Sequence, residues 1–324
     1  MRFLTTVFGV GDGHRMFQAD VLRWKCFAPH PFWEGSRGYA LRYKGAIAAF
    51  GCVVPCRFLT GAGIVASCNV IDWAADKTVP GAGAMLYRHI QGLAGTMINI
   101  GGTADARRVL PQIGFQARAD RQVFTRVLRP WRHFRQTEQR DWKSPLRLAR
   151  DIRELGRAQV AAAGILTAHR LDSFVNMPAE VFPGPSITGQ AVCARTAALF
   201  DYFMACPAAE VTAHLLERDR TPAGYFLLSR VGAQCRIADL WIGSPDQRVW
   251  AAAYSAATSA ARTDRKISEV VVAVSAPLAA SALVQAGYRR THQEPVYVFD
   301  PERRLGDQLA VGFLENDGYY WHGS

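Results

Sequence analysis

A short glycine turn at residues 80–83 is the part of this sequence best suited to binding an anion. Pro80-Gly81-Ala82-Gly83 stands between an apolar stretch and an amphipathic one. Two glycines let the backbone approach a ligand closely, and the helix expected to follow opens with unpaired N–H groups at the positive end of its dipole. A diphosphate fits such a site.

Polar residues in the neighbouring apolar runs are candidates for chemistry. Asp72 is the carboxylate at the end of the run Gly63–Asp72, and Asn69 lies inside that run. Asn99 lies in the next apolar run, and a buried amide needs hydrogen-bond partners. The alternative is structural: Asp72 caps a strand or loop, and the two asparagines satisfy neighbouring backbone.

Strand and helix patterns indicate how these groups are positioned. In the first half we expect a strand at Phe3–Val10, a helix near His14–Lys25, a hairpin of Tyr39–Tyr43 with Ala46–Val54, the strand Gly63–Asp72, and a helix near Ala84–Leu93. In the second half we expect helices at Ser186–Phe203, Ala208–Arg218 and Val249–Arg262, a hairpin of Gly224–Arg230 with Gln234–Ile242, and strands at Tyr288–Phe299 and Leu309–Leu314. The glycine turn therefore joins a strand to a helix.

One module occurs twice in the chain, at residues 96–115 and 270–288. Each copy reads as an apolar strand, a helix and a glycine–aromatic pair that opens another strand. The aligned positions are Ala106, Leu110, Gly114 and Phe115 in the first copy and Ala279, Leu283, Gly287 and Tyr288 in the second. Constant spacing indicates a duplicated domain, and the mixture of elements indicates an α+β (mixed α/β) fold.

The order strand, glycine turn, helix, strand, helix, glycine–aromatic, strand resembles the GNAT acetyltransferase superfamily, whose members bind acyl-CoA with a Gln/Arg-x-x-Gly-x-Gly/Ala loop. Gly81 and Gly83 match the two small positions of that loop. The resemblance covers residues 37–128 and 222–300. It implies two tandem GNAT-like domains, each a mixed, mostly antiparallel sheet flanked by helices, as in Fem-type aminoacyl transferases and N-myristoyltransferase.

Some positions depart from the pattern of the superfamily. Thr78 stands at the Gln/Arg position, and Thr103 stands where Asn is usual. Leu110 stands where the superfamily usually has the tyrosine that acts as general acid. Tyr87 is a nearby substitute for the missing acid. The second copy's loop, residues 243–248, has no Gly-x-Gly pair.

The resemblance implies direct attack of an acceptor amine or hydroxyl on the thioester of acetyl-CoA or another acyl-CoA, with no metal. The cofactor-binding residues that it implies are Thr78, Val79, Gly81, Ala82, Gly83, Ala84, Thr103 and Arg107. The catalytic role, a general base acting on the nucleophile, falls to Asp72 with Asn69 beside it.

The repeat suggests three segments along the chain. We expect an acyl-CoA-binding domain at residues 1–130, a basic, partly helical linker at 131–175, and a second domain at 176–324 with a degenerate cofactor loop. The active cleft is expected in the N-terminal half, with the C-terminal half building the acceptor wall or a structural interface.

Two further hypotheses remain open. A Fem-type enzyme would use aminoacyl-tRNA as donor, and a non-catalytic binding protein would keep a degenerate transferase fold without the chemistry. A small molecule, sugar or peptide is the expected acceptor, nucleic acid belongs to the Fem-type hypothesis, and a homodimer is compatible with all three.

Composition limits these choices. The 324 residues carry a formal net charge of +11, which favours an anionic partner or substrate. The most basic stretch, residues 129–157, reads either as a solvated helix packed on one face or as a docking patch for an acidic partner. Seven cysteines without a Cys-x-x-Cys pair, and no apolar run of a membrane-spanning length, suggest a cytoplasmic protein with reduced thiols.

Overall fold

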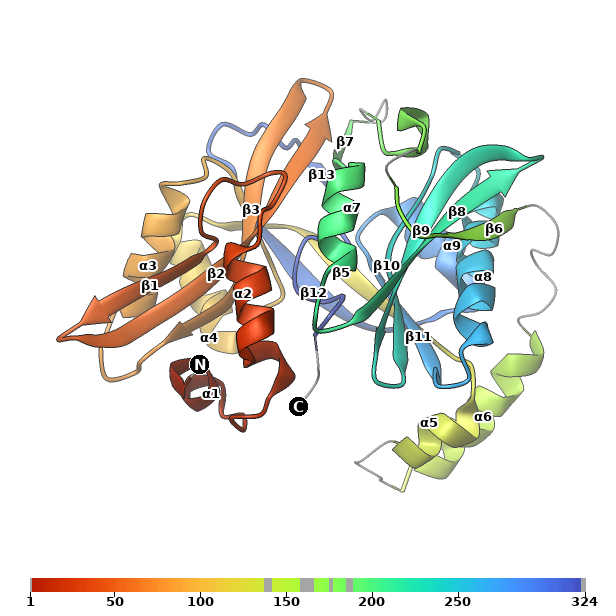
Figure 1. The fold of residues 1–324 in the computed structure, drawn as a ribbon, viewed down its shortest axis with the longest axis horizontal. Coiled ribbons are helices and arrows are strands. Elements are labelled where there is room, and N and C mark those ends of the chain that lie inside the picture. The colour runs from red at the N-terminus through yellow and green to blue at the C-terminus, as the bar shows by residue number, and fades with distance from the viewer. Residues whose placement is uncertain (1, 137–141, 158–165, 175–176, 185–188, 322–324) are drawn as a thin grey trace.

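The computed structural model describes residues 2–136, 142–157, 166–174, 177–184 and 189–321 (Figure 1). The described strands form one mixed sheet, in the order β13-β7-β2-β3-β4-β12-β5-β11-β10-β9-β8-β6, with β1 paired to β2. The strands are β1 (Gly38–Tyr43), β2 (Ala46–Thr60), β3 (Gly63–Ala75), β4 (Met97–Ile100), β5 (Gln116–Val127), β6 (Thr167–Leu171), β7 (Gln190–Cys193), β8 (Glu210–Arg218), β9 (Thr221–Val231), β10 (Gln234–Ile242), β11 (Glu269–Val274), β12 (Arg289–Phe299) and β13 (Gln308–Ala310). The predicted α+β class is confirmed.

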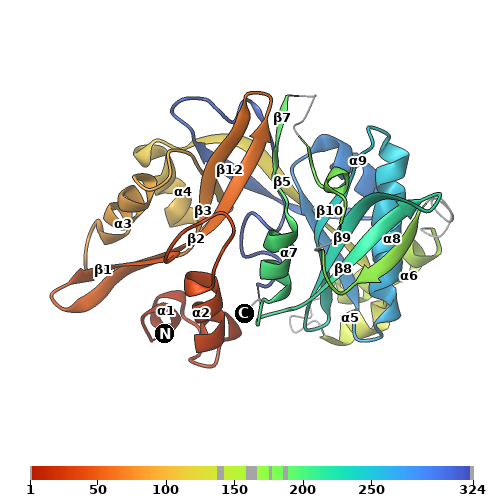
Figure 2. The ribbon, with the colours of Figure 1, turned by 45° about the horizontal axis from the view of Figure 1, so that its top comes forward.

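Helices cover both ends of this sheet and the middle of the molecule (Figures 1 and 2). The α-helices are α1 (Arg2–Phe8), α2 (Ala19–Phe27), α3 (Ala82–Gln91), α4 (Ala104–Val109), α5 (Pro130–Gln136), α6 (Ser144–Arg157), α7 (Ala197–Met204), α8 (Gln247–Thr263) and α9 (Pro277–Gln285). Short 3₁₀ turns are η1 (Arg15–Phe17), η2 (Leu110–Ile113) and η3 (Ala179–Val181). We call residues 2–128 the N-terminal half and residues 177–321 the C-terminal half.

The two halves exchange a strand. β5, from the N-terminal half, pairs with β11 of the C-terminal half, while β12, from the C-terminal half, pairs with β4 of the N-terminal half. β5 and β12 also pair with each other along most of their lengths. The exchange makes one continuous sheet out of two similar halves, and the division at residue 130 stays a prediction.

The repeated module has the same local geometry in both copies. Gly114 and Gly287 adopt left-handed conformations, with φ of 94° and 81°, at the end of the helical segment. The following aromatic residue donates its backbone N–H to a leucine carbonyl in each case, Phe115 to Leu110 at 3.1 Å and Tyr288 to Leu283 at 2.9 Å. Glycine is required there because an L side chain rarely adopts this conformation.

Four expected elements differ in the structure. Residues 3–10 contain helix α1 rather than a strand, and residues 208–218 contain strand β8 rather than a helix. The stretch expected to be helical at 186–203 contains strand β7 and helix α7, and residues 186–188 lie outside the described part. The strand expected at Leu309–Leu314 is limited to β13, which runs parallel to β7. Each of these segments contacts distant parts of the chain, α1 with β3, β8 with β6, and β13 with β7, and such long-range contacts override local preference.

The middle of the molecule is an aromatic layer that joins the halves. The Trp24 ring of α2 stacks on Tyr202 of α7, with ring centroids 4.8 Å apart. The buried guanidinium of Arg37 donates to the carbonyls of Trp24, Lys25 and Ala28, at the end of α2. These bonds satisfy carbonyls that a helix end leaves unpaired, and they fix α2 against the sheet.

Candidate active site

Two pairs of parallel strands separate in this sheet, one in each half. β3 and β4 pair only at Cys68–Met97 and Asn69–Ile98, after which their facing edges diverge. β10 and β11 pair from Gln234–Glu269 to Ile237–Val272 and then diverge in the same way. Backbone groups on such edges are free to bond a ligand.

Each long strand carries a bulge where the separation begins. In β3 the bulge falls between the partners of Phe50 and Cys52, and Asp72 there has φ of 52°. In β10 the register shifts between Ile237 and Asp239. A bulge changes which face the following side chains occupy. In both halves it presents an aspartate toward the middle of the molecule.

The N-terminal separation opens into a cavity of about 580 Å³, which we call the N cavity. Its walls include both diverging edges, residues 69–73 of β3 and residues 99–103 at the end of β4. Its far side is made by residues of β5, β10, β12 and the tail segment 313–318. The volume is that of a site for a small organic molecule.

Two asparagines place unused acceptors on the wall of the N cavity. The Asn69 amide donates to the carbonyl of Glu315 at 2.8 Å, and the Asn99 amide donates to the Tyr87 hydroxyl at 3.3 Å. The Oδ1 atom of each has no hydrogen-bond partner among the described residues. Buried acceptors of this kind call for a donor such as an amide N–H of a ligand.

Asp72 faces the N cavity in a buried ion pair. Lys25 Nζ lies 2.5 Å from Asp72 Oδ2, and the two side chains are 2% and 1% exposed. Burial lowers the pKa of Lys25, but the charge of Asp72 outweighs it, and the pKa of Lys25 rises. Asp72 Oδ1 has no partner among the described residues. The predicted base is therefore neutralised by a lysine that the sequence analysis did not connect with it.

Asp317 is a second carboxyl on the wall of the N cavity, and sequence reasoning missed it. Burial is the larger cause and the charge of Asp72 is the second, and together they raise the pKa of Asp317 to about 6. Such a group exchanges its proton near neutral pH, as a general base must. In the sequence Asp317 is part of an Asn-Asp-Gly turn signal, and nothing local marks it as functional.

The predicted cofactor loop begins helix α3. Gly81 takes the left-handed conformation, with φ of 80°, at the N-cap of α3, where no side chain caps the helix. Gly83 lies against β3, because a Cβ there would be 3.1 Å from Ala75 and 3.2 Å from the Trp73 indole. The Trp73 indole N–H donates to the Gly83 carbonyl at 3.1 Å, and Trp73 also lines the N cavity. Trp73 thus connects the turn to the cavity.

The other predicted cofactor residues separate into two groups. Thr78 donates to Asp76 from both its hydroxyl and its backbone N–H, which shapes the turn; Val79, Ala82 and Ala84 belong to the same turn and the start of α3. Thr103 lines the N cavity and caps α4. Arg107 is exposed on α4 and is not part of the cavity wall.

The C-terminal separation opens into a second cavity of about 580 Å³, which we call the C cavity. Its lining is mainly apolar and aromatic, with Trp241, Trp250, Tyr254 and Leu278 among the walls. Helix α8 begins beside it, and the Asp246 carboxylate caps that helix by accepting from the Arg248 N–H at 2.8 Å. A capped, acidic helix start is a poor site for a diphosphate, in contrast to the start of α3.

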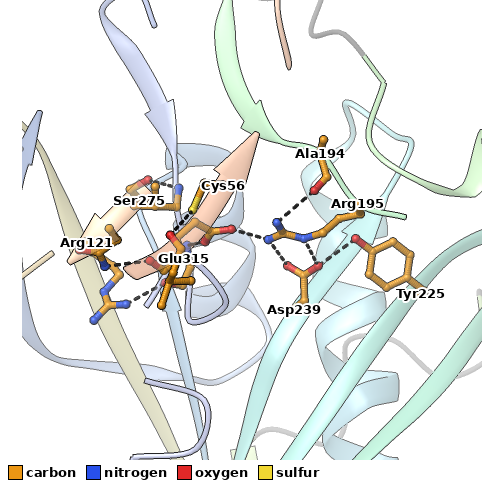
Figure 3. Close-up of polar contacts among 12 residues, drawn as sticks. Cys56, Arg121, Ala194, Arg195, Tyr225, Asp239, Ser275 and Glu315 are labelled. Atoms are coloured by element: carbon orange, nitrogen blue, oxygen red, sulfur yellow. Dashed lines mark hydrogen bonds and ion pairs between the residues drawn. The ribbon is translucent and has the colours of Figure 1, made fainter. Parts of the chain in front are cut away.

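One wall of the C cavity is an ionic network (Figure 3). Arg195 donates to Asp239 at 2.8 Å and to Glu315 at 2.5 Å, and the Tyr225 hydroxyl donates to Asp239 at 2.9 Å. Burial raises the pKa of Glu315, but Arg195 outweighs it, and the net shift is downward. Arg195 therefore favours the charged form of Glu315, and Asp239 has Arg195 and the Tyr225 hydroxyl as partners.

The tail of the chain separates the two cavities. Gly312 and Glu315 line the C cavity, while Asn316, Asp317 and Gly318 line the N cavity. Arg121 fixes this tail by donating to the Gly312 carbonyl at 2.7 Å. Successive residues of one segment thus give one carboxylate to each cavity.

Comparison with known proteins identifies the fold. No model of a protein family matches the sequence, and no curated protein matches it. A solved GCN5-related N-acetyltransferase from Anabaena variabilis ATCC 29413 matches with a TM-score of 0.60 and 11% identity, over 92% of this chain and 68% of that one. Saccharomyces cerevisiae N-myristoyltransferase, solved with bound myristoyl-CoA, matches with a TM-score of 0.59 and 10% identity, over 92% and 79%.

A third solved structure is a probable N-acyltransferase from Enterococcus faecalis V583, with a TM-score of 0.54 and 9% identity, over 94% of this chain and 71% of that one. The chain therefore has the fold of the GCN5-related N-acetyltransferases, and the predicted resemblance is confirmed at the level of the fold. Among the described residues, no helix is long and apolar enough to cross a membrane.

Proposed function

We propose that the protein is an acyl-CoA-dependent acyltransferase whose N cavity binds the thioester. The observation that carries the proposal is the cavity along the diverging edges of β3 and β4, which ends at a carboxyl whose pKa is about 6. The fold is shared with N-acetyltransferases and with a protein solved with myristoyl-CoA. These neighbours support acyl-CoA as the co-substrate.

The pantetheine arm is an extended chain with two amides. Free edges of β3 and β4 and the Oδ1 atoms of Asn69 and Asn99 offer acceptors and donors along its path. The diphosphate would lie at the start of α3, where Gly81 leaves the helix uncapped. The residues of this half thus suit each part of the ligand in turn.

Asp317 is the proposed general base. The acceptor nitrogen or oxygen attacks the thioester carbonyl carbon, its proton passes to Asp317, and the carbon–sulfur bond breaks. The CoA thiolate leaves and takes a proton from water. Tyr87, the substitute acid suggested by the sequence, is fully buried and holds the Asn99 amide, so we assign it a positioning role.

The C cavity is proposed to hold an apolar part of the acceptor. Its aromatic walls suit an apolar body, and the net charge of Arg195, Asp239 and Glu315 is −1, which favours a cationic amine nearby.

Isothermal titration with acetyl-CoA tests the proposal. We expect micromolar binding near one site per chain and its loss when Asn99 and Asn69 are both changed to leucine. Two sites per chain would mean that the C cavity also takes a thioester. Absence of binding to acetyl-CoA and to CoA would overturn the proposal and favour the aminoacyl-tRNA or the non-catalytic hypothesis.

A further inference from the structure

A buried arginine on the far wall of the N cavity has no acidic hydrogen-bond partner. Arg236 lies on β10, belongs to the C-terminal half and is 8% exposed. Its Nη1 atom has no hydrogen-bond partner among the described residues, and the residue lines the cavity. A buried guanidinium N–H without a hydrogen-bond partner is costly unless a ligand accepts from it.

The guanidinium is held in a fixed orientation. Its Nε donates to the Gln234 Oε1 atom at 2.7 Å, and the Gln234 amide donates to Glu269 at 2.8 Å. Burial lowers the pKa of Arg236 to about 10, so the side chain remains a cation at neutral pH. Gln234 thus accepts from the Nε–H group of Arg236, and the Nη1 group remains free to donate to a ligand.

The other cations near this wall are already paired. Arg121 donates to Glu294 and to the tail, and Lys25 is paired with Asp72. A guanidinium presents two N–H groups in the plane that a carboxylate or a phosphate prefers. Among the described residues that line this cavity, Arg236 is therefore the cation with an N–H group left for an anionic ligand group.

We propose that the acceptor carries a carboxylate or phosphate that binds Arg236, so that its nucleophile lies at Asp317 on the same cavity. This inference rests on the proposed function and names its substrate class, an amine or alcohol that also bears an anion. The net charge of +11 agrees with an anionic substrate, and the anion requirement makes Arg236 the specificity-determining residue.

The first experiment compares matched acceptors in a thiol-release assay with acetyl-CoA. β-Alanine is set against β-alaninamide for the carboxylate, and phosphoethanolamine against ethanolamine for the phosphate. We expect at least roughly tenfold higher kcat/KM for an anionic member, which is the effect of one charge-assisted hydrogen bond pair. The two pairs decide between carboxylate and phosphate.

Arg236→Met should remove that preference by raising KM for the anionic acceptor, while the Kd for acetyl-CoA is unchanged. Arg236→Lys should keep part of the preference for anionic acceptors. Arg290→Met, at an exposed position, is the matched control. Far-ultraviolet circular dichroism checks the fold of each variant. Equal use of neutral and anionic acceptors would overturn this inference and leave the proposed function intact.

A direct binding measurement covers the case in which none of these acceptors reacts. Inorganic phosphate and malonate are titrated into the wild type and Arg236→Met in the presence of acetyl-CoA. Binding that is lost in the variant supports the inference. Equal binding, or none to either protein, overturns it, whereas failure of acetyl-CoA to bind the wild type would overturn the proposed function instead.

The segment 142–157, which contains helix α6, carries a second, independent feature, three large apolar side chains that are exposed to solvent. One side of the helix packs inward through Ser144, Leu148 and Asp151. Trp142, which precedes the helix, Leu146 and Ile152 are 78%, 64% and 46% exposed, and Leu146 and Ile152 lie about 120° apart around the helix axis. Large apolar side chains gathered on one exposed segment mark an interaction surface.

The surroundings of these exposed apolar side chains are basic. Residues 142–157 contain five basic and two acidic residues, and exposed Arg265 and Lys266 lie at the nearby end of α8. Figure 1 shows α5 and α6 at the edge of the C-terminal half, projecting from the sheet. Arg129 and Arg132 tie α5 to that end by donating to backbone carbonyls at residues 262, 265 and 267.

We infer that α6 docks on an anionic lipid surface. Tryptophan and aliphatic side chains flanked by lysine and arginine are the composition of helices that lie in the membrane interface. An acidic protein would match the charge, but it would not account for the exposed Trp142, Leu146 and Ile152.

Vesicle co-sedimentation tests this inference with the full chain. We expect partitioning to phosphatidylcholine vesicles only when they contain phosphatidylglycerol, and a decrease as salt rises. Leu146→Glu with Ile152→Glu should weaken it by roughly tenfold or more. Val284→Glu, at an exposed position of α9, is the matched control.

Equal partitioning to both vesicle types, or an equal loss in the control, would overturn the lipid assignment. So would binding to a homopolymeric RNA without binding to vesicles, since that result would assign the surface to nucleic acid.

Discussion

Lys25 and Asp72 form an ion pair of 2.5 Å that is almost completely shielded from water. Asp72 stands at the bulge of β3, and Lys25 stands near the end of α2, whose last carbonyls Arg37 satisfies. The pair therefore joins the central helix to the strand that borders the N cavity. Asp239 and Arg195 form the corresponding pair beside the C cavity.

Removing one partner of this pair should be strongly destabilising. Lys25→Met leaves a buried, uncompensated carboxylate, so we expect a loss of about 3–5 kcal/mol in the free energy of unfolding. The double change Lys25→Met with Asp72→Leu should recover much of that loss. Urea unfolding of the three proteins measures the effect, and equal stability of the single and double variants would contradict it.

Asp317 should control the pH dependence of activity. Because its folded pKa is about 6, kcat/KM should rise with pH as the carboxyl loses its proton. Asp317→Asn should lower kcat/KM by about 10²–10⁴-fold and leave acetyl-CoA binding unchanged. The matched control is Asp307→Asn, because Asp307 is an exposed carboxyl far from the cavity wall.

Asp317 also affects how the free energy of unfolding depends on pH. The folded protein keeps the Asp317 proton up to about pH 6, whereas an unfolded aspartate releases it near 3.8. Between these values the folded state binds more protons, so this group lowers the free energy of unfolding as pH rises. Asp317→Asn should lack that component, and unfolding curves across this range would show the difference.

Gly81 should be essential to cofactor binding and not merely to the turn. Gly81→Asp puts a carboxylate at the start of α3, so acetyl-CoA binding should weaken by roughly tenfold or more. Gly45→Asp is a close control, because Gly45 has φ of 83° against 80° for Gly81 and both have open space around the Cβ position. Similar stabilities with different Kd values, measured by titration, would support the assignment; equal Kd values would refute it.

Filling the C cavity should affect the acceptor alone. Ala276 lines this cavity and is half-buried, so Ala276→Phe occupies space there. We expect KM for an apolar acceptor to rise by about tenfold or more, with unchanged Kd for acetyl-CoA. Ala256→Phe, at a half-buried position of α8 outside the cavity, controls for packing strain. A rise in the acetyl-CoA Kd would instead assign the C cavity to the donor.

The parts of the fold that could be read from the sequence are those set by local chemistry. The Lys44-Gly45 hairpin forms as expected, because both residues adopt positive φ. The glycine–aromatic turns at Gly114 and Gly287 also form as the repeat predicts. In each case one or two residues determine the backbone conformation, so a short window suffices.

The remaining features depend on contacts between distant residues. β8 lies between β6 and β9, and its alternating burial is that of a strand, although Ala208–Arg218 has the composition of a helix. Asp317 acquires its raised pKa from burial and from Asp72, 245 positions away in the sequence. Lys25 likewise meets Asp72 only after α2 packs on β3. No window of sequence contains both partners of such a contact.

The exchange of β5 and β12 also determines when during synthesis this protein can complete its sheet. β4 has β3 on one side but lacks its other neighbour, β12, until residues 289–299 have left the ribosome. Until then β5 and β4 present unpaired edges of the kind that associate with other chains. The nascent chain should therefore need a holding chaperone, and neither half should be obtainable as a separate folded fragment.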